Sequence, residues 1–149
     1  MGKHDKTALV HAVDLLARQE QSSNKLREKL LRKGYGEEEI EAAILCLREK
    51  RYLNDEDACR RQFQFLYENS RSSVRQICAK LMQRGFESSM VRDCVPGETY
   101  ERELRAALRV LAVKHKPTAD RQKMMANLYA KGFGSDVSRA AVEAFLCGE

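Results

Sequence analysis

The basic side chains of this 149-residue chain are its strongest candidates for a chemical role, and they are unevenly distributed. Residues 1–56 carry 11 Lys and Arg against 11 Asp and Glu, residues 57–97 carry 7 against 4, and residues 98–149 carry 9 against 7. The formal net charge of +5 therefore arises after residue 56. Guanidinium and ammonium groups gathered in this way bind phosphates or acidic protein surfaces.

Two interpretations of these cations stay open on the sequence alone. Arg102, Arg105 and Arg109 recur at helical spacing, which places them along one face of a helix. Such a face is either ordinary solvated surface or a contact surface for a phosphate-bearing or acidic partner. For the second interpretation, the predicted contact residues are Arg71, Arg75, Lys80, Arg84, Arg92, Arg102, Arg105 and Arg109.

Histidine and carboxylate side chains do not form a catalytic or metal-binding pattern. His4, His11 and His115 have no partner at a spacing that suggests a shared site, and no His-Glu-x-x-His or Walker-type glycine loop occurs. The acidic run from Glu37 to Glu39, with Glu41, is expected in the first turn of a helix, where carboxylates favour the helix dipole. We therefore predict a protein that is not an enzyme, without catalytic residues, metal or cofactor.

The cysteines favour free thiols in a reducing compartment. They are odd in number and contain no Cys-x-x-Cys pair, which argues against a disulfide framework or a zinc site. Small buried hydrophobic side chains or free thiols are the expected state. The residues concerned are Cys46, Cys59, Cys78, Cys94 and Cys147.

No membrane or secretory signal is expected. The longest apolar runs fall well short of the roughly 18 residues that span a bilayer. Met1 to Val10 lacks the layout of a secretory signal, and Lys6 stands where a myristoylation signal needs Ser or Thr. We expect a cytoplasmic monomer.

A repeat of about 50 residues is the main structural evidence in the sequence. Three segments read apolar, apolar, any residue, basic, Gly, aromatic, which is the chemistry of a helix that ends at a left-handed glycine. The basic residue faces the negative end of the helix dipole, and the aromatic residue can fold back on the helix. The segments are 30–35, 81–86 and 128–133, with glycines at Gly34, Gly85 and Gly132.

Each of these helix ends has a matching start. Twelve residues before the three glycines stand Ser22, Ser73 and Asp120, all of which are good N-cap residues. A longer amphipathic helix is expected before each capped helix, and a further helix after each glycine. The middle copy is expected to end early, at Pro96-Gly97. Expected core faces include Leu9, Ala12, Val13, Leu16 and Ala17, and Leu104, Ala107, Leu108, Leu111 and Ala112.

The sequence therefore predicts an all-α protein of three tandem three-helix repeats. The predicted boundaries are 1–52, 53–96 and 97–149. Because a unit of this size buries little surface by itself, neighbouring repeats are expected to stack into an elongated, curved body, wound to the right or to the left.

The residues between Leu26 and Phe86 resemble the RecX regulators of bacterial recombination. The resemblance is carried by the run from Leu26 to Tyr35, by Tyr52-Leu53-Asn54-Asp55, and by Val74-Arg75-Gln76-Ile77 followed by Arg84-Gly85-Phe86. It covers nearly the whole chain, more weakly in the third repeat. The chain departs from the family pattern at Arg51, where the family usually has Gly, and at Ser72-Ser73, where a glycine often stands.

The resemblance implies a modulator of RecA. Such a protein binds the RecA filament on single-stranded DNA, lodges along its helical groove and opposes filament growth, ATP hydrolysis, strand exchange and coprotease activity. The residues leave two alternatives open: a helical module that binds DNA directly, and a helical scaffold for another protein. The modest net charge and the absence of an aromatic stacking platform make the first alternative less favoured.

Overall fold

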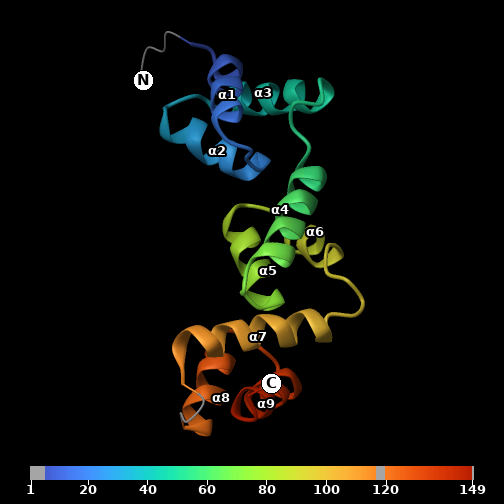
Figure 1. Ribbon diagram of the computed structural model, residues 1–149. Coiled ribbons are helices and arrows are strands. Elements are labelled where there is room, and N and C mark those ends of the chain that lie inside the picture. Colours follow the sequence, from blue (N-terminus) through green and yellow to red (C-terminus); the bar gives the residue numbers. More distant parts are fainter. Residues whose placement is uncertain (1–5, 117–119, 149) are drawn as a thin grey trace. The chain divides into compact units, whose positions relative to one another are not determined.

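The computed structural model describes residues 6–116 and 120–148, and all regular elements in these ranges are helices. The predicted all-α class is confirmed. Met1 and His4, which entered the sequence analysis, lie outside the described residues. The helices are α1 (Ala8–Arg18), α2 (Ser23–Arg32), α3 (Glu37–Glu49), α4 (Asp55–Asn69), α5 (Val74–Gln83), α6 (Ser88–Asp93), α7 (Tyr100–Lys114), α8 (Arg121–Ala130) and α9 (Ser135–Leu146), as Figure 1 shows.

The chain divides into two compact units. Unit 1 comprises residues 1–62 and 81–91, and unit 2 comprises residues 63–80 and 92–149. Within unit 1, α1, α2 and α3 pack together; within unit 2, α7, α8 and α9 do so (Figure 1). The predicted second repeat contributes to both units, and the predicted repeat boundaries stay a prediction.

The core of unit 1 lies between its first three helices. Four of its side chains are at most 1% exposed: Leu26, Leu30, Ile44 and Leu47. Tyr35 belongs to the same cluster of buried residues. These leucines and isoleucines recur every three or four residues, which puts them on one face of α2 and one face of α3. Removing each such side chain from water contributes about 1.5–3 kcal/mol to folding.

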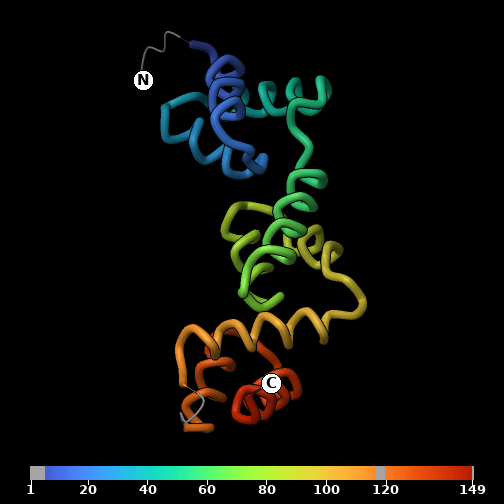
Figure 2. The backbone as a smooth tube through the Cα atoms, viewed as in Figure 1, coloured from blue at the N-terminus to red at the C-terminus, as the bar shows by residue number. Residues whose placement is uncertain are grey.

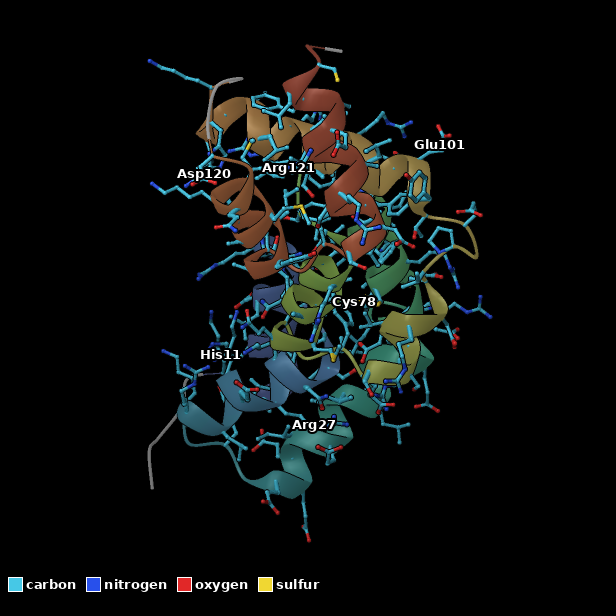
Figure 3. All side chains as sticks on the ribbon, turned by 90° about the horizontal axis from the view of Figure 1, so that it is seen from below. His11, Arg27, Cys78, Glu101, Asp120 and Arg121 are labelled. Atoms are coloured by element: carbon cyan, nitrogen blue, oxygen red, sulfur yellow. The ribbon has the colours of Figure 1, made fainter. Side chains whose placement is uncertain are left out.

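The core of unit 2 repeats this arrangement with α7, α8 and α9. Met124 and Leu128 of α8 are fully buried, as the i, i+4 spacing predicts, and Leu111 of α7 packs with them. Ala141 and Val142 supply the facing surface of α9. Asp120 and Arg121, labelled in Figure 3, mark the start of α8.

The predicted core faces of α1 and α7 are wrong at some positions, where residues expected in the core are exposed. Val13 is 43% exposed and Ala17 and Ala112 are exposed, while Ala106 and Val110 are buried and were not predicted. The apolar stripe on both helices is wider than one seam, so spacing alone permits more than one orientation. Contacts with the neighbouring helices select the orientation.

The three glycine helix ends have the predicted left-handed geometry. The aromatic residue that follows each glycine is at most 5% exposed, and its backbone N–H donates to the carbonyl five residues earlier, as in a Schellman motif. This bond satisfies a carbonyl that the helix leaves without a partner. The φ angles are 95° for Gly34, 94° for Gly85 and 91° for Gly132.

The predicted cap Ser22 has a second role within unit 1. Its hydroxyl oxygen accepts from Lys25 N at 3.1 Å, which caps α2, and its hydroxyl donates to the carbonyl of Arg84 at 2.6 Å. A Cβ at Gly85 would lie 2.5 Å from this hydroxyl oxygen. The serine therefore joins the start of α2 to the end of α5, and only glycine fits there.

Ser73 forms the same junction in unit 2. Its hydroxyl oxygen accepts from Gln76 N at 3.1 Å and its hydroxyl donates to the carbonyl of Lys131 at 2.6 Å. A Cβ at Gly132 would lie 2.8 Å from Ser73 Oγ. We call these two contacts the serine–glycine junctions. Each satisfies a backbone donor at one helix start and a backbone acceptor at another helix end.

Carboxylates from other helices complete the helix starts. Asp55 Oδ1 accepts from Ser23 N at 2.9 Å, and Glu103 Oε1 accepts from Val74 N at 2.6 Å. Glu39, from the acidic run, accepts from Ala8 N at 2.8 Å. The run does occupy the first turn of α3, as expected, and one of its members also supports α1.

Arg51 is the one described residue other than glycine with a positive φ angle, at 62°. It lies in the turn between α3 and α4, at the position where the RecX pattern usually has glycine. A side chain in this left-handed conformation costs roughly 1–2 kcal/mol. The turn between α3 and α4 therefore holds an arginine in a backbone conformation that glycine adopts without this cost.

Alanine at Gly85 is expected to destabilise the protein by about 2–3 kcal/mol, because the left-handed conformation becomes strained and the bond from Ser22 is displaced. Urea unfolding followed by circular dichroism measures the change. The matched control is Gly97→Ala, since a Cβ there meets nothing within 4 Å. Equal stabilities for the two variants would contradict the junction.

Arg51→Gly is expected to raise the free energy of unfolding by roughly 0.5–1 kcal/mol, since relief of the left-handed strain exceeds the added entropy of the unfolded chain. Arg51→Lys keeps the strain and serves as the control. A thermal melt in which Arg51→Gly unfolds no later than Arg51→Lys would show that the turn is not strained.

Candidate functional site

The predicted contact residues fall on α5, α6, α7 and the segments beside them, and all except Arg102 are exposed. Arg71 precedes α5, Arg75 and Lys80 lie on it, and Arg84 follows it. Two of these side chains also have local roles. Arg84 Nη1 donates to Gln62 Oε1 at 2.7 Å. Arg75 packs close to Gly132, because a Cβ added to this glycine would lie 3.2 Å from Arg75 Cβ.

Arg102 is a structural residue, which corrects its place among the predicted surface contacts. It is 7% exposed, and its guanidinium lies against the end of α4. Nε donates to the carbonyl of Tyr67 at 2.9 Å and Nη1 to the carbonyl of Ser72 at 2.6 Å. Nη2 donates to the carbonyls of Ser70 and Leu66 at 3.2 and 3.4 Å. A helix end exposes unpaired carbonyls and a negative dipole, and this cation satisfies both.

Glu103 balances the buried charge of Arg102. The two groups form an ion pair at 3.4 Å, and Glu103 is 9% exposed. Burial lowers the pKa of the Arg102 guanidinium, and burial raises the pKa of the Glu103 carboxyl against the opposing effects of Val74 N–H and Arg102. Through these contacts the Arg102–Glu103 pair connects α7 to the end of α4 and to the start of α5 in unit 2.

The exposed cations differ from one part of the chain to the other in how they are neutralised. Before residue 62, many cations have carboxylate partners within 4.0 Å; one of them, Arg27, is labelled in Figure 3. The hydrogen bond from Arg27 lowers the pKa of Glu41. These pairs are Lys6–Asp14, Lys25–Glu28, Arg27–Glu41, Arg32–Glu28, Arg60–Asp57 and Arg61–Glu20.

Most of the predicted contact residues have no such partner. Among the residues that the structure describes, no ion pair involves an exposed member of the predicted set; the buried member, Arg102, pairs with Glu103. The charges of the exposed members are therefore available to an external anion. Arg84 is set apart because its guanidinium is bound to Gln62 Oε1. We call the following residues the unpaired cations: Arg71, Arg75, Lys80, Arg92, Arg105 and Arg109.

Two of the unpaired cations line a pocket within unit 2. The pocket has a volume of about 290 Å³ and lies where α7 passes the end of α4. Arg105 and Arg109 of α7 line it together with Tyr67, Glu68 and Ser70. The tube in Figure 2 follows the chain from the end of α6 into α7, the helix that carries both arginines.

No group of three His, Cys, Asp or Glu side chains in residues 6–116 and 120–148 is placed to hold a metal ion. The same ranges contain no helix that is both long enough and apolar enough to cross a bilayer. None of the five cysteines forms a disulfide within the described residues, and they range from the buried Cys59 to the exposed Cys147. Burial raises the pKa of the Cys78 thiol.

Comparison with known proteins identifies the family. Residues 8–45, which cover α1, α2 and most of α3, match the family model for the first three-helix domain of RecX. The chain is 31% identical over 147 residues to the regulatory protein RecX of Neisseria meningitidis, a match that covers 95% of this chain and 92% of the relative. The chain belongs to the RecX family.

Other RecX proteins agree with this placement. The regulatory protein RecX of Caldanaerobacter subterraneus is 30% identical over 132 residues, and the match covers 86% of this chain and 65% of that relative's length. The crystal structure of RecX from Lactobacillus salivarius superimposes with a TM-score of 0.79 at 17% identity, covering 93% of this chain and 94% of the other. The fold is therefore that of RecX.

Replacing Arg102 with alanine is expected to destabilise the protein by about 3 kcal/mol, because the carbonyls at the end of α4 and the Glu103 carboxylate lose their partner. Arg109→Ala removes an exposed cation from the same helix and is expected to change stability by less than about 0.5 kcal/mol. Urea unfolding distinguishes the two. Similar, small losses would place Arg102 at the surface instead.

Proposed function

We propose that this chain regulates RecA by binding the RecA filament on single-stranded DNA. In this role it opposes filament growth and thereby reduces ATP hydrolysis, strand exchange and coprotease activity. Membership of the RecX family, whose relatives are named regulatory proteins, supports a regulatory role. The observation that carries the proposal is the set of unpaired cations, because a surface of this kind binds an acidic, phosphate-bearing partner.

The unpaired cations suit a filament better than they suit bare DNA. A nucleoprotein filament offers phosphates and acidic protein side chains together, so cations spread over several helices can each find an anion. We expect the chain to act as a monomer in the cytoplasm, with direct DNA binding as a weaker, secondary contact.

The test is RecA's DNA-dependent ATPase, measured with and without the protein as salt is raised. Inhibition is expected at well below one protein per RecA, and salt is expected to relieve it because each phosphate contact releases counterions. The variant Arg71→Glu, Arg75→Glu, Arg105→Glu is expected to lose most of the inhibition, while circular dichroism shows it folded.

A charge-matched control separates this surface from general electrostatics. Arg18→Glu, Lys29→Glu, Lys50→Glu reverses the same number of charges on unit 1 at residues outside the ion pairs, and it should inhibit nearly as well as the unaltered chain. Loss of inhibition in both variants would mean that net charge alone acts. Tight binding to bare DNA without any inhibition would favour the alternative of a direct DNA-binding module.

A further inference from the structure

The pocket on α7 gathers positive charge that the described carboxylates do not neutralise. Arg105 and Arg109 line it from successive turns of the helix, and neither belongs to an ion pair within the described residues. Burial, and to a smaller extent the positive charge of Arg105, lower the pKa of Arg102 beneath them. Arg105 and Arg109 thus present two positive charges to the pocket, which a bound anion would compensate.

The charges in the pocket match one monoanion. Arg102 is compensated by its ion pair with Glu103. Glu68, which also lines the pocket, contributes one negative charge and accepts from Gln64 Nε2 at 3.0 Å. Against it stand the two positive charges of Arg105 and Arg109, so the pocket keeps a net charge near +1. A phosphodiester group carries the complementary charge of −1.

The aromatic contacts in the pocket favour a phosphate over a nucleobase. The Tyr67 ring stacks on Phe63 with centroids 5.5 Å apart, and the Arg102 guanidinium lies 4.9 Å from its centroid. The ring is thus engaged by its own neighbours and offers no platform to a base.

We propose that this pocket binds a backbone phosphate of single-stranded DNA through Arg105 and Arg109. The inference rests on the proposed function, which brings the protein to such a strand. Side chains four residues apart on a helix lie about 5–6 Å from each other at Cβ. Two guanidinium groups so placed reach different oxygens of one tetrahedral phosphate, and phosphate contacts hold a strand without reading its sequence.

Fluorescence anisotropy with a labelled short oligothymidylate tests the site. The variant Arg105→Gln, Arg109→Gln is expected to bind at least about tenfold more weakly at moderate salt, and its salt slope is expected to fall by about 0.7, because one phosphate contact is lost. The control Lys114→Gln, Lys123→Gln removes the same charge from exposed positions of the same unit and should lose less than about threefold. An oligonucleotide of mixed sequence should give the same ratios.

A second probe separates a phosphate site from a carboxylate site. An oligothymidylate with neutral methylphosphonate linkages should bind the unaltered chain and the pocket variant equally weakly. Equal losses in the pocket variant and its control would overturn the assignment. So would a pocket variant that binds DNA normally but no longer binds RecA in the absence of DNA, because the pocket would then take protein carboxylates.

The ATPase assay distinguishes failure of the phosphate site from failure of the proposed function. If the unaltered chain inhibits RecA while its DNA affinity is insensitive to the pocket variant, the phosphate site is wrong and filament regulation stands. If the unaltered chain binds DNA through the pocket and does not inhibit RecA, filament regulation is wrong and the phosphate site stands.

Discussion

The hydrogen bond from a capping serine to the carbonyl before a left-handed glycine is the contact on which the repeat architecture depends. One hydroxyl accepts from the start of its own helix and donates to the end of another, so two unsatisfied backbone groups find partners at once. The contact requires a donor at the cap and no Cβ at the glycine. Asp120 caps α8 by accepting from Gln122 N, but a carboxylate cannot donate to a carbonyl as Ser22 and Ser73 do.

The distribution of free charge follows from this architecture. Asp55 and Glu103 complete the helix starts at the two junctions, and the buried end of α4 takes Arg102 as its cap. Before residue 62 six cations pair with carboxylates, whereas in residues 63–116 and 120–148 only Arg102 and Arg121 do so, and Arg105 and Arg109 belong to no ion pair. Surface ion pairs add little stability, so the difference bears on binding more than on folding.

The helix starts, the glycine ends and the all-α class were predictable because each depends on residues close together in sequence. Ser22 was identifiable as a cap, but its bond to Arg84 joins residues 62 positions apart, and no local pattern indicates such a pairing. Arg102 and Arg105 are equivalent in periodicity. They differ because the end of α4 meets one and solvent meets the other, which explains why the sequence placed both at the surface.

The most direct measurement is the affinity of this chain for RecA assembled on single-stranded DNA, followed as salt is raised from about 50 to 200 mM. If the unpaired cations hold the protein on the filament, the logarithm of the binding constant falls linearly with the logarithm of the salt concentration, by about 0.7 for each single-strand phosphate contact. An affinity that stays constant over this range would contradict a filament interface built on these cations.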